Sequence, residues 1–468
     1  MFKAVTSIAP AASSCCRRGV LFRSSAPLTS FYQLNTSACF STTSQLMAST
    51  EFKGAKRLEG NYGNVWVEYI ALTMKHNALN LGQGFPDFAP PDYVTKALVE
   101  AVTGPNVLLN QYTRGYGHPR LVNAIAKLFS KLHDRPVDPM TNVLVTAGAY
   151  ESLFCCFQGF INPGDEVIII EPFFDCYEPM TRAAGGTPVF VPLRPSKPGS
   201  LMTSAEWKLD PAELESKFSR KTKALVINTP NNPLGKVFTR EELEMIANLC
   251  KKYNVLVFAD EVYEWLLYDG HKHTRIATLP GMWDRTLTIS SAGKTFSVTG
   301  WKLGWTVAPD HLMKHVSAFH QNCVYTCATP IQEAAAVGFE LELGRLDSPD
   351  CYFLELPAML QPKRDLLAAQ LQEVGMLPVT PDGGYFMVAD FSHLGVETGD
   401  DSDEPKDCKF VKWLIREKKF ATIPTSAFYS KEHKSVAENY IRFCFIKEDS
   451  TLRRAGDILK EWKRSLKQ

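Results

Sequence analysis

Short β-rich runs alternate with helical segments between about residues 78 and 328, and this alternation constrains the fold more than any other feature of the chain. The runs cover residues 142–146, 166–170, 187–191, 224–228, 255–259 and 286–290. Their apolar residues lack strict alternation, as expected for strands that helices cover on both faces. The pattern predicts an α/β fold built on a mostly parallel sheet sandwiched by helices.

The pattern changes after about residue 330. Longer helical segments cover 331–344 and 356–374, a few strands follow, and an amphipathic helix begins near Leu452. We therefore predict a large domain over 78–329, a smaller α+β domain over 330–468, and an N-terminal arm over 48–77 that joins the smaller domain. The acidic stretch 397–407 has no periodicity and is interpreted as a solvated loop.

One helix between two of the predicted strands carries a readable start signal. Thr239 is the expected N-cap, and Glu242 three residues later completes a capping box. Lys251 and Lys252 then lie at the end of the helix where the dipole favours positive charge.

The first 50 residues differ in composition from the rest. They contain no Asp or Glu, and Lys3, Arg17, Arg18 and Arg23 lie among many Ser, Ala and Thr residues. This composition is typical of a mitochondrial transit peptide, which we place at residues 1–47 and which predicts a matrix protein. An ordinary disordered tail is the alternative, and a start at Met47 would give a cytosolic form.

Charge and cysteine usage exclude several classes of protein. Lys and Arg number 51 against 50 acids, so no global field exists to hold nucleic acid or an anionic membrane, and a small-molecule partner is expected. The 12 cysteines include no C-x-x-C pair, which favours reduced thiols over a disulfide framework or a zinc ribbon. No window after the leader reaches the roughly 18 apolar residues that span a bilayer.

The segment 290–305 carries the strongest chemical signal. Its Gly293-Lys294-Thr295 run is not a phosphate P-loop, because that motif requires a glycine at position 288, where this chain has Thr288. A lysine just after a strand suits a pyridoxal phosphate site instead. Lys294 would form the Schiff base, while Ser291 and Lys302 would hold the phosphate.

Two further strand ends support this interpretation. Asp260 follows a buried strand at the crevice where open α/β sheets bind ligands, and a protonated pyridine nitrogen would supply the cation that such a carboxylate needs. Tyr263 could bond the phenolate oxygen of the cofactor. Asn232, in the turn-rich run 228–235, could donate to that oxygen and to a substrate carboxylate. Taken singly, Asp260 could also be a helix N-cap and 228–235 an ordinary tight loop.

Taken together, these motifs resemble the fold-type I aminotransferases, which use pyridoxal 5′-phosphate. Within them, the local phrases at 81–87, 110–113, 171–177 and 440–445 are similar to the kynurenine aminotransferases, also known as glutamine transaminase K or cysteine-conjugate β-lyase. The resemblance runs from about Phe52 to the C-terminus. It implies that the domain over 78–329 binds the cofactor and that the enzyme is a homodimer with shared active sites.

The resemblance also implies a role for each matching residue. Lys294 is the Schiff-base lysine, Asp260 meets the pyridine nitrogen, and Asn232 and Tyr263 meet the phenolate oxygen. Phe174 stacks on the ring. The phosphate is implied to contact Ser291, Lys302, the backbone of Ala149 and Tyr150, and Tyr112 of the neighbouring subunit. Arg442 is the implied clamp for the substrate α-carboxylate, with Asn232 and the Gly84 backbone. The implied side-chain pocket has Trp66, Tyr112, Tyr150 and Tyr325 as walls.

These residues predict ping-pong transamination of kynurenine and other large neutral or aromatic amino acids, with kynurenic acid forming from the oxo-acid product of kynurenine. Alternatives are a β-lyase acting on cysteine conjugates, another aromatic or glutamine aminotransferase, and a noncatalytic relative. The aminotransferase-like half of a transcription regulator would need a DNA-binding domain, for which the leader has no helix-turn-helix pattern. We interpret His271, His273, His311 and His315 as residues of exposed loop and helix faces, and predict no metal.

Overall fold

A seven-stranded sheet forms the centre of the computed structural model, which describes residues 54–59 and 65–466. The strands lie in the order β2 (Val143–Thr146), β11 (Gly304–Val307), β10 (Thr286–Ser291), β9 (Leu256–Asp260), β8 (Thr222–Asn228), β3 (Glu166–Glu171) and β4 (Thr187–Pro192). All neighbouring pairs are parallel except those of β11, which runs antiparallel to β10 and β2. The predicted α/β class and each predicted strand are confirmed. β11 was not predicted, because its four residues lie inside a motif that was interpreted chemically.

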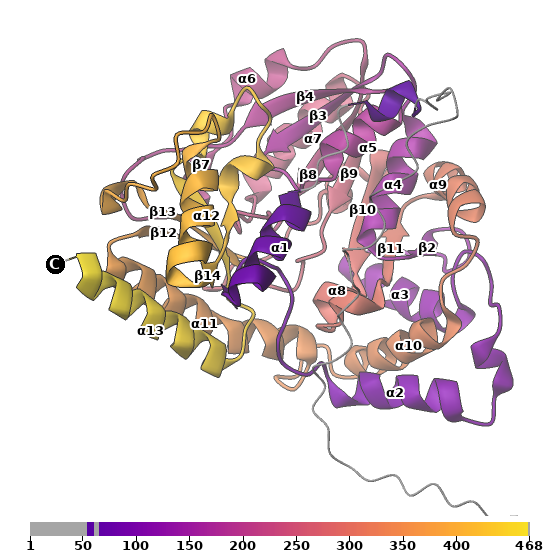
Figure 1. The fold of residues 1–468 in the computed structure, drawn as a ribbon. Coiled ribbons are helices and arrows are strands. Elements are labelled where there is room, and N and C mark those ends of the chain that lie inside the picture. Colours follow the sequence, from indigo (N-terminus) through magenta and orange to yellow (C-terminus); the bar gives the residue numbers. More distant parts are fainter. Residues whose placement is uncertain (1–53, 60–64, 467–468) are drawn as a thin grey trace, which may run out of the picture. The chain divides into compact units, whose positions relative to one another are not determined.

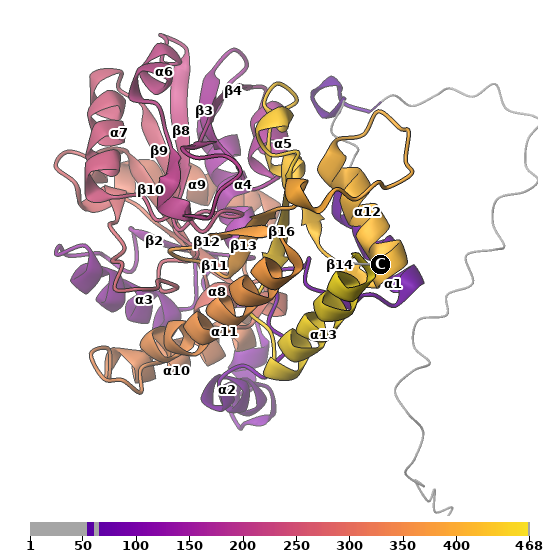
Figure 2. The ribbon, with the colours of Figure 1, turned by 90° about the vertical axis from the view of Figure 1, so that its left-hand side faces the viewer.

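Helices cover both faces of this sheet, as Figures 1 and 2 show. On one face, Val167 and Ile169 of β3 pack against the layer of α4 (Ala149–Phe160), α5 (Tyr177–Ala183) and α9 (Asp310–Cys323). On the other face, Ile168 and Ile170 pack against α6 (Pro211–Ser216) and α7 (Arg240–Lys252). The successive residues of β3 alternate between two apolar layers, which explains why the strand is apolar at every position.

The capping box predicted at the start of α7 is present. The Thr239 side chain accepts from the Glu242 N–H, and the Glu242 carboxylate accepts from the Thr239 N–H. Three further helices complete the first body: α2 (Asp92–Thr103), α3 (Pro119–Leu132) and α10 (Thr329–Leu343). They pack with Trp305 of β11 in one apolar cluster.

A second, five-stranded sheet lies mostly in the C-terminal part of the chain. Its order is β15 (Ile423–Pro424), β16 (Tyr440–Cys444), β13 (Phe386–Asp390), β12 (Leu377–Thr380) and β6 (Met202–Thr203). The helices α1 (Val65–His76), α11 (Tyr352–Val374), α12 (Lys406–Lys418) and α13 (Asp449–Leu466) contribute to its apolar cluster. Figures 1 and 2 show α11 and α13 side by side. The predicted helices at 331–344, 356–374 and from Leu452 are thus present as α10, α11 and α13.

Two small two-stranded sheets complete the strand pairing. β1 (Leu79–Asn80) pairs with β14 (Phe420–Ala421), and β5 (Arg194–Pro195) pairs with β7 (Trp207–Lys208). β6 belongs to the second sheet although it lies inside the predicted large domain, and residues from 54 onward form one compact unit. The boundary at residue 330 and the arm over 48–77 stay predictions. The predicted transit peptide over 1–47 lies outside the described residues.

Two sequence-based expectations were wrong in part. The acidic stretch 397–407 is mainly exposed, but Asp407 at its end is fully buried in the first turn of α12. Its carboxylate accepts from the Ser426 N–H and the Cys408 N–H, which offsets the cost of burial. His273 was interpreted as exposed, yet its side chain is 3% exposed and its Nε2 lies 2.7 Å from a Glu261 carboxylate oxygen.

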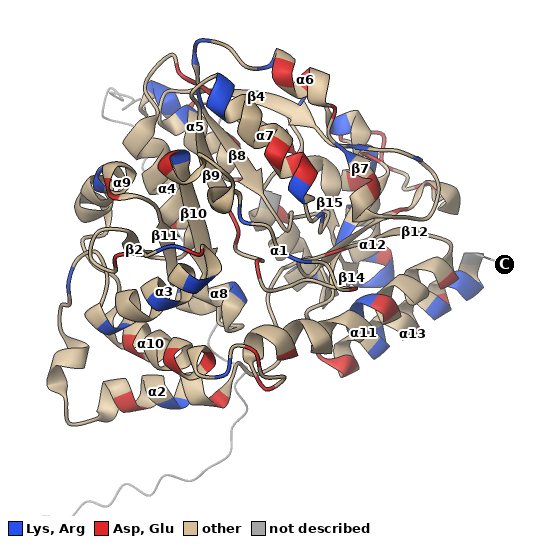
Figure 3. Cartoon of the chain, turned by 180° about the vertical axis from the view of Figure 1, so that it is seen from behind, with Lys and Arg blue, Asp and Glu red and all other residues tan. Residues whose placement is uncertain are grey.

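Acidic and basic residues are interspersed along α7, α11 and α13, as Figure 3 shows. No helix among the described residues has the length and apolar character required to cross a membrane. The described cysteines, which begin at Cys155, are all free thiols.

Candidate active site

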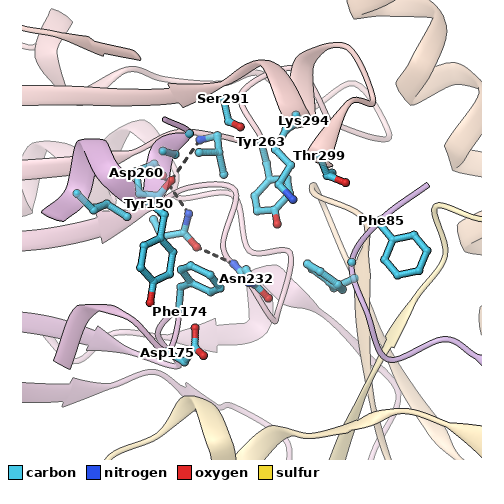
Figure 4. A pocket seen from close by; sticks show the side chains of 18 of the residues that line it. Phe85, Tyr150, Phe174, Asp175, Asn232, Asp260, Tyr263, Ser291, Lys294 and Thr299 are labelled. Atoms are coloured by element: carbon cyan, nitrogen blue, oxygen red, sulfur yellow. Dashed lines mark hydrogen bonds between the residues drawn. The ribbon is translucent and has the colours of Figure 1, made fainter. Parts of the chain in front are cut away.

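A cavity of about 440 Å³ lies where the carboxyl ends of β8, β9 and β10 face residues of the second sheet. Because these three strands are parallel, their ends meet at one edge, and Asn228 is the register partner of Asp260. The cavity is lined by most of the predicted site residues: Trp66, Gly84, Ala149, Tyr150, Phe174, Asn232, Asp260, Tyr263, Ser291, Lys294, Lys302 and Arg442. Figure 4 shows how the labelled ones surround it.

Lys294 lies in α8 (Ala292–Thr295), directly after β10. Its amine donates to the hydroxyl of Tyr385 and lies 5.7 Å from the centre of the Tyr263 ring. Burial lowers the pKa of Lys294 to about 8, and the positive charge of Lys302 acts in the same direction, while Cys444 and Asp260 oppose it. A lysine with such a pKa can be neutral or charged near physiological pH, which suits a group that takes up and returns protons.

Asp260 ends β9 and is buried at the floor of the cavity. Its carboxylate accepts from the Tyr177 hydroxyl at 2.5 Å and from the Val262 N–H at 3.4 Å. Burial raises the pKa of Asp260 to about 6, although the Tyr177 hydrogen bond and the charge of Lys294 lower it. No ion pair of Asp260 is present among the described residues, so this acid lacks the cationic partner that a buried carboxylate normally has.

An anion site lies at the start of α4. The first N–H groups of a helix have no partner inside the helix, and they attract negative charge. Lys302 reaches the same place, because its Nζ would lie 3.3 Å from a Cβ built on Gly148. Gly304 lets β11 approach: a Cβ there would lie 2.5 Å from the Ala149 nitrogen. With Ser291 in the same wall, this corner has the donors that a phosphate group requires.

Arg442, on β16, is 1% exposed. Its guanidinium donates to the Asn232 side-chain oxygen at 3.0 Å and to the Gly82 carbonyl at 2.6 Å, and its Nε has no partner in the described structure. It lies 3.9 Å from the centre of the Phe386 ring and 5.1 Å from that of Trp66. Burial lowers the pKa of Arg442 to about 10. The group therefore stays charged at neutral pH, and the two acceptors that it bonds are neutral.

Aromatic side chains form the remaining wall. Tyr150 and Phe174 lie edge to face with ring centres 6.2 Å apart, and Trp66 donates from its indole N–H to Asp175 at 2.6 Å. In Figure 4, Tyr150, Phe174 and Asp175 lie on one side of the cavity, across from Lys294 and Tyr263. Among the described residues, the side chains of this wall are aromatic or, at Asp175, acidic, and none of them is a cation.

Two predicted residues do not line this cavity. Tyr112 and Tyr325 are 83% and 55% exposed, and they pack edge to face against each other with ring centres 5.7 Å apart. Tyr325 has a positive φ of 71°, which is unusual for a residue with a side chain. Within one chain, therefore, the structure does not bring this pair to the other site residues.

Sequence reasoning missed two tyrosines that contact predicted catalytic groups. Tyr177, which holds Asp260, lies in the phrase 171–177 that supported the resemblance, but nothing in its spacing indicated a partner. Tyr385, which accepts from Lys294, follows Gly383 and Gly384 just before β13. Paired glycines before aromatic residues indicate close backbone approach, and this is the signal that could have directed attention to Tyr385.

The cavity thus combines a buried acid, an anion site at a helix N-terminus, a lysine and an arginine around one space. The comparisons agree: the family model for aminotransferase class I and II matches residues 76–459. The chain belongs to this family of transaminases.

Within this family, the chain is similar to kynurenine–oxoglutarate transaminases. Kynurenine–oxoglutarate transaminase 3 of Mus musculus is 56% identical over 423 residues, which cover 90% of this chain and 92% of the relative. Kynurenine–oxoglutarate transaminase 1 of Homo sapiens is 52% identical, with 87% and 98% covered. Among solved structures, Bna3p from Saccharomyces cerevisiae aligns with a TM-score of 0.82 at 36% identity, covering 88% of this chain and 99% of that one. The predicted family and enzyme class are confirmed.

Proposed function

We propose that this protein is a pyridoxal phosphate-dependent transaminase for large neutral and aromatic amino acids, with kynurenine among its donors and a 2-oxo acid as acceptor. The names of the relatives support the donor, since both the mouse and the human protein are kynurenine–oxoglutarate transaminases. The cavity supports the chemistry independently, because it places an acid, an anion site, a lysine and an arginine around one space.

The residues present fit pyridoxal phosphate. When bound, this cofactor supplies a carbonyl carbon that takes up the amino group and a ring that delocalises the negative charge formed at the substrate Cα. Asp260 would hold the protonated ring nitrogen, and this pairing would satisfy an acid that has no cationic partner among the described residues. Ser291, Lys302 and the start of α4 would hold the phosphate, Phe174 would cover the ring, and Asn232 and Tyr263 would bond its phenolate oxygen.

The observation that carries the proposal is the unpaired guanidinium of Arg442. A charged group that is 1% exposed and has only neutral acceptors is costly unless a ligand supplies the opposite charge. An α-carboxylate does so, and it can bond a planar guanidinium with two parallel hydrogen bonds. Asn232, whose side-chain oxygen accepts from Arg442, keeps its amide N–H groups for the substrate carboxylate or the cofactor.

Lys294 is the group that moves the proton. Its pKa of about 8 leaves a useful share of the neutral amine at neutral pH. The neutral amine would accept the proton from the substrate Cα and return it to the cofactor carbon that takes up the amino group. The enclosing aromatic wall excludes water from this step and strengthens each electrostatic contact around it.

The cavity wall favours neutral side chains. Trp66, Tyr150 and Phe174 offer apolar surface, whereas Asp175 would repel a second carboxylate on the substrate. An acidic side chain would therefore be desolvated without a cation, at a cost of several kcal/mol. Ordinary donors have no leaving group at Cβ, so we expect transamination as the main activity and β-elimination only with cysteine conjugates.

We propose further that the enzyme is a homodimer. Tyr112 and Tyr325 are large aromatic residues exposed on the described surface. The apolar Val107 and Leu108, which are near Tyr112 in sequence, are exposed as well. A second copy covering this face would remove apolar area from water and could bring Tyr112 to the phosphate of the other subunit. A mixture of Lys294→Ala chains and Tyr112→Phe chains should then show more turnover than the separate variants, because one site of the mixed dimer holds both native residues.

For the leader, we propose cleavage on entry to mitochondria. N-terminal sequencing of the protein isolated from the organelle should start after about residue 47, and an intact Met1 there would contradict cleavage.

A substrate panel tests the proposed function. Kynurenine, phenylalanine, glutamine, aspartate and a cysteine conjugate are each paired with pyruvate, glyoxylate and 2-oxoglutarate, and kcat/KM is measured. We expect the large neutral donors to exceed aspartate by tenfold or more, which corresponds to about 1.4 kcal/mol. A preference for aspartate, or conjugate cleavage faster than every transamination, would overturn the proposal.

A further inference from the structure

Tyr385 contacts both Lys294 and Gly84, to which the family resemblance assigns separate roles. Its hydroxyl oxygen accepts from the Lys294 amine, and its O–H donates to the Gly84 carbonyl at 2.9 Å. The side chain is 1% exposed, just before β13. The ring lies edge to face with Tyr263, with centres 5.1 Å apart, so its orientation is fixed by packing as well as by hydrogen bonds.

The direction of these two hydrogen bonds has a consequence for Lys294. The Tyr385 proton is committed to the Gly84 carbonyl, which can only accept. Toward Lys294, the phenol oxygen therefore acts as an acceptor, and one of the amine N–H bonds is the donor. In the neutral amine, this arrangement leaves the nitrogen lone pair unused and free to face the cavity.

The segment that carries the Gly84 carbonyl is held in place from several sides. Leu81 N–H donates to Ala421 O at 2.9 Å, Cys444 N–H donates to Leu81 O at 2.7 Å, and Lys447 donates to Phe85 O at 2.9 Å. Gly84 itself tolerates no side chain, because a Cβ there would lie 2.3 Å from the Phe386 ring. The segment 81–85 also supplies the Gly82 carbonyl that accepts from Arg442.

We propose that Tyr385 is a positioning residue for Lys294: its hydroxyl, fixed by the Gly84 carbonyl, aims the amine at the substrate Cα and ties its position to the segment that holds Arg442. This inference rests on the proposed function. It assigns no proton transfer to Tyr385, whose pKa burial raises well above its ordinary value, so the phenol stays neutral throughout.

The titratable groups that face Lys294 come from several elements. They are Asp260 at the end of β9, Tyr263 after it, Lys302 before β11, Arg442 and Cys444 on β16, and Tyr385 before β13. Within this set, Tyr385 is the group that accepts a hydrogen bond from the Lys294 amine. Its removal should therefore change the protonation of Lys294 directly.

The test is Tyr385→Phe, with Tyr268→Phe as the matched control. Tyr268 is equally buried and donates its hydroxyl to the Gly384 carbonyl at 2.5 Å. The Tyr268→Phe variant therefore loses a hydroxyl-to-carbonyl hydrogen bond of the same kind, and Tyr268 makes no hydrogen bond to Lys294. Both variants are loaded with pyridoxamine phosphate, in which Lys294 is a free amine, and the pH dependence of its reductive methylation is read by mass spectrometry.

In Tyr385→Phe, the charged form of Lys294 loses an acceptor, so its pKa should fall by about one unit. The kcat should fall by about 10- to 100-fold because the amine is less well aimed, with little change in KM for the donor. The isotope effect with a Cα-deuterated donor should increase, because proton transfer becomes slower relative to other steps. Tyr268→Phe should leave the Lys294 pKa and the isotope effect at their wild-type values.

Equal effects of the two substitutions on the Lys294 pKa and on the isotope effect would overturn the inference and leave Tyr385 as a packing residue. A wild-type enzyme without any amino-group transfer would instead contradict the proposed function. The two failures are therefore distinguishable in the same set of measurements.

Discussion

The two sheets bring opposite buried charges to the same cavity. β9 of the first sheet brings Asp260, and β16 of the second brings Arg442; neither makes an ion pair within the described residues. Elsewhere in the described structure, the buried Arg275 pairs with Glu264, and the buried Lys236 pairs with Glu242 at 2.9 Å. Among the described residues, Asp407 is also buried without an ion pair, but its carboxylate accepts from two backbone N–H groups. Asp260 and Arg442 differ from it because they face a cavity that a ligand could fill.

The two groups also respond to burial differently. Burial raises the pKa of Asp260 to about 6, so this acid can avoid its charge by taking up a proton in mildly acidic solution. Burial lowers the pKa of Arg442 only to about 10, so the guanidinium stays charged throughout the physiological range. The second sheet therefore requires an anion, whereas the first sheet has an acid whose charge a cationic ligand can stabilise.

Lys294 lies between these charges, and its removal should have the largest effect. Lys294→Ala should reduce turnover by about 10⁴-fold or more, because proton transfer loses its acid and base. The thermal midpoint should not decrease, since a buried amine is removed. The bound cofactor should lose its wild-type visible absorbance. Wild-type turnover in this variant, measured in the steady state, would contradict the role of Lys294.

The Arg442 side of the comparison is tested with Arg442→Ala. We expect amino acids to lose about 2–5 kcal/mol of transition-state binding, because their α-carboxylate becomes buried without a partner. Affinity for pyridoxal phosphate should change little. The control is an amine that lacks the α-carboxylate, whose already slow reaction should be unaffected. Equal losses for both substrates, in kcat/KM, would show that Arg442 is not the clamp.

Asp260→Asn tests the buried acid of the first sheet through the pH dependence of the unfolding free energy. Because the pKa of Asp260 is raised from 3.8 to about 6 in the folded protein, its contribution to stability is complete below about pH 4 and is lost as the pH rises through 6. Above that range, the cofactor-free variant should be more stable than wild type by about 3 kcal/mol. Saturating pyridoxal phosphate should reverse the order, because the ring nitrogen then pairs with the acid.

Urea unfolding at pH 4 and at pH 7, with and without the cofactor, provides these values. If the difference in unfolding free energy between wild type and Asp260→Asn were the same at both pH values, the pKa of Asp260 would not be raised by burial, and this part of the account would be wrong.

The smallest effect is expected far from the cavity, at the start of α7. Thr239→Ala removes the capping interaction with Glu242 and should cost about 1 kcal/mol of unfolding free energy. The kcat and KM should not change, because α7 supplies no residue to the cavity wall. A loss of turnover with this substitution would show that the site depends on global stability as well as on the two buried charges.

Sequence patterns predicted every strand of the large sheet except β11, and they predicted the groups at its edge because parallel strands bring their ends together. Lys294, Asp260 and Asn232 were located in this way. The second sheet was harder to predict: β6 joins it from residues 202–203, and Arg442 would have been one more arginine on a strand without the resemblance to a family. The roles of Tyr177 and Tyr385 arise from contacts between segments distant in sequence. The paired glycines before Tyr385 indicate a close backbone approach but not its contact with Lys294, and nothing in the sequence indicates the contact of Tyr177 with Asp260.

The central claim is that the cavity holds pyridoxal phosphate and an amino acid between these opposite charges and transfers the amino group. The direct test is a single half-reaction: the loaded enzyme is mixed with excess kynurenine or glutamine in the absence of any 2-oxo acid, and the absorbance of the cofactor and the released product are followed. The account predicts a shift of the absorbance and about one equivalent of 2-oxo acid per subunit, with recovery of the original spectrum after pyruvate is added. Continued release of product with free ammonia, or no spectral change with any amino acid, would contradict it.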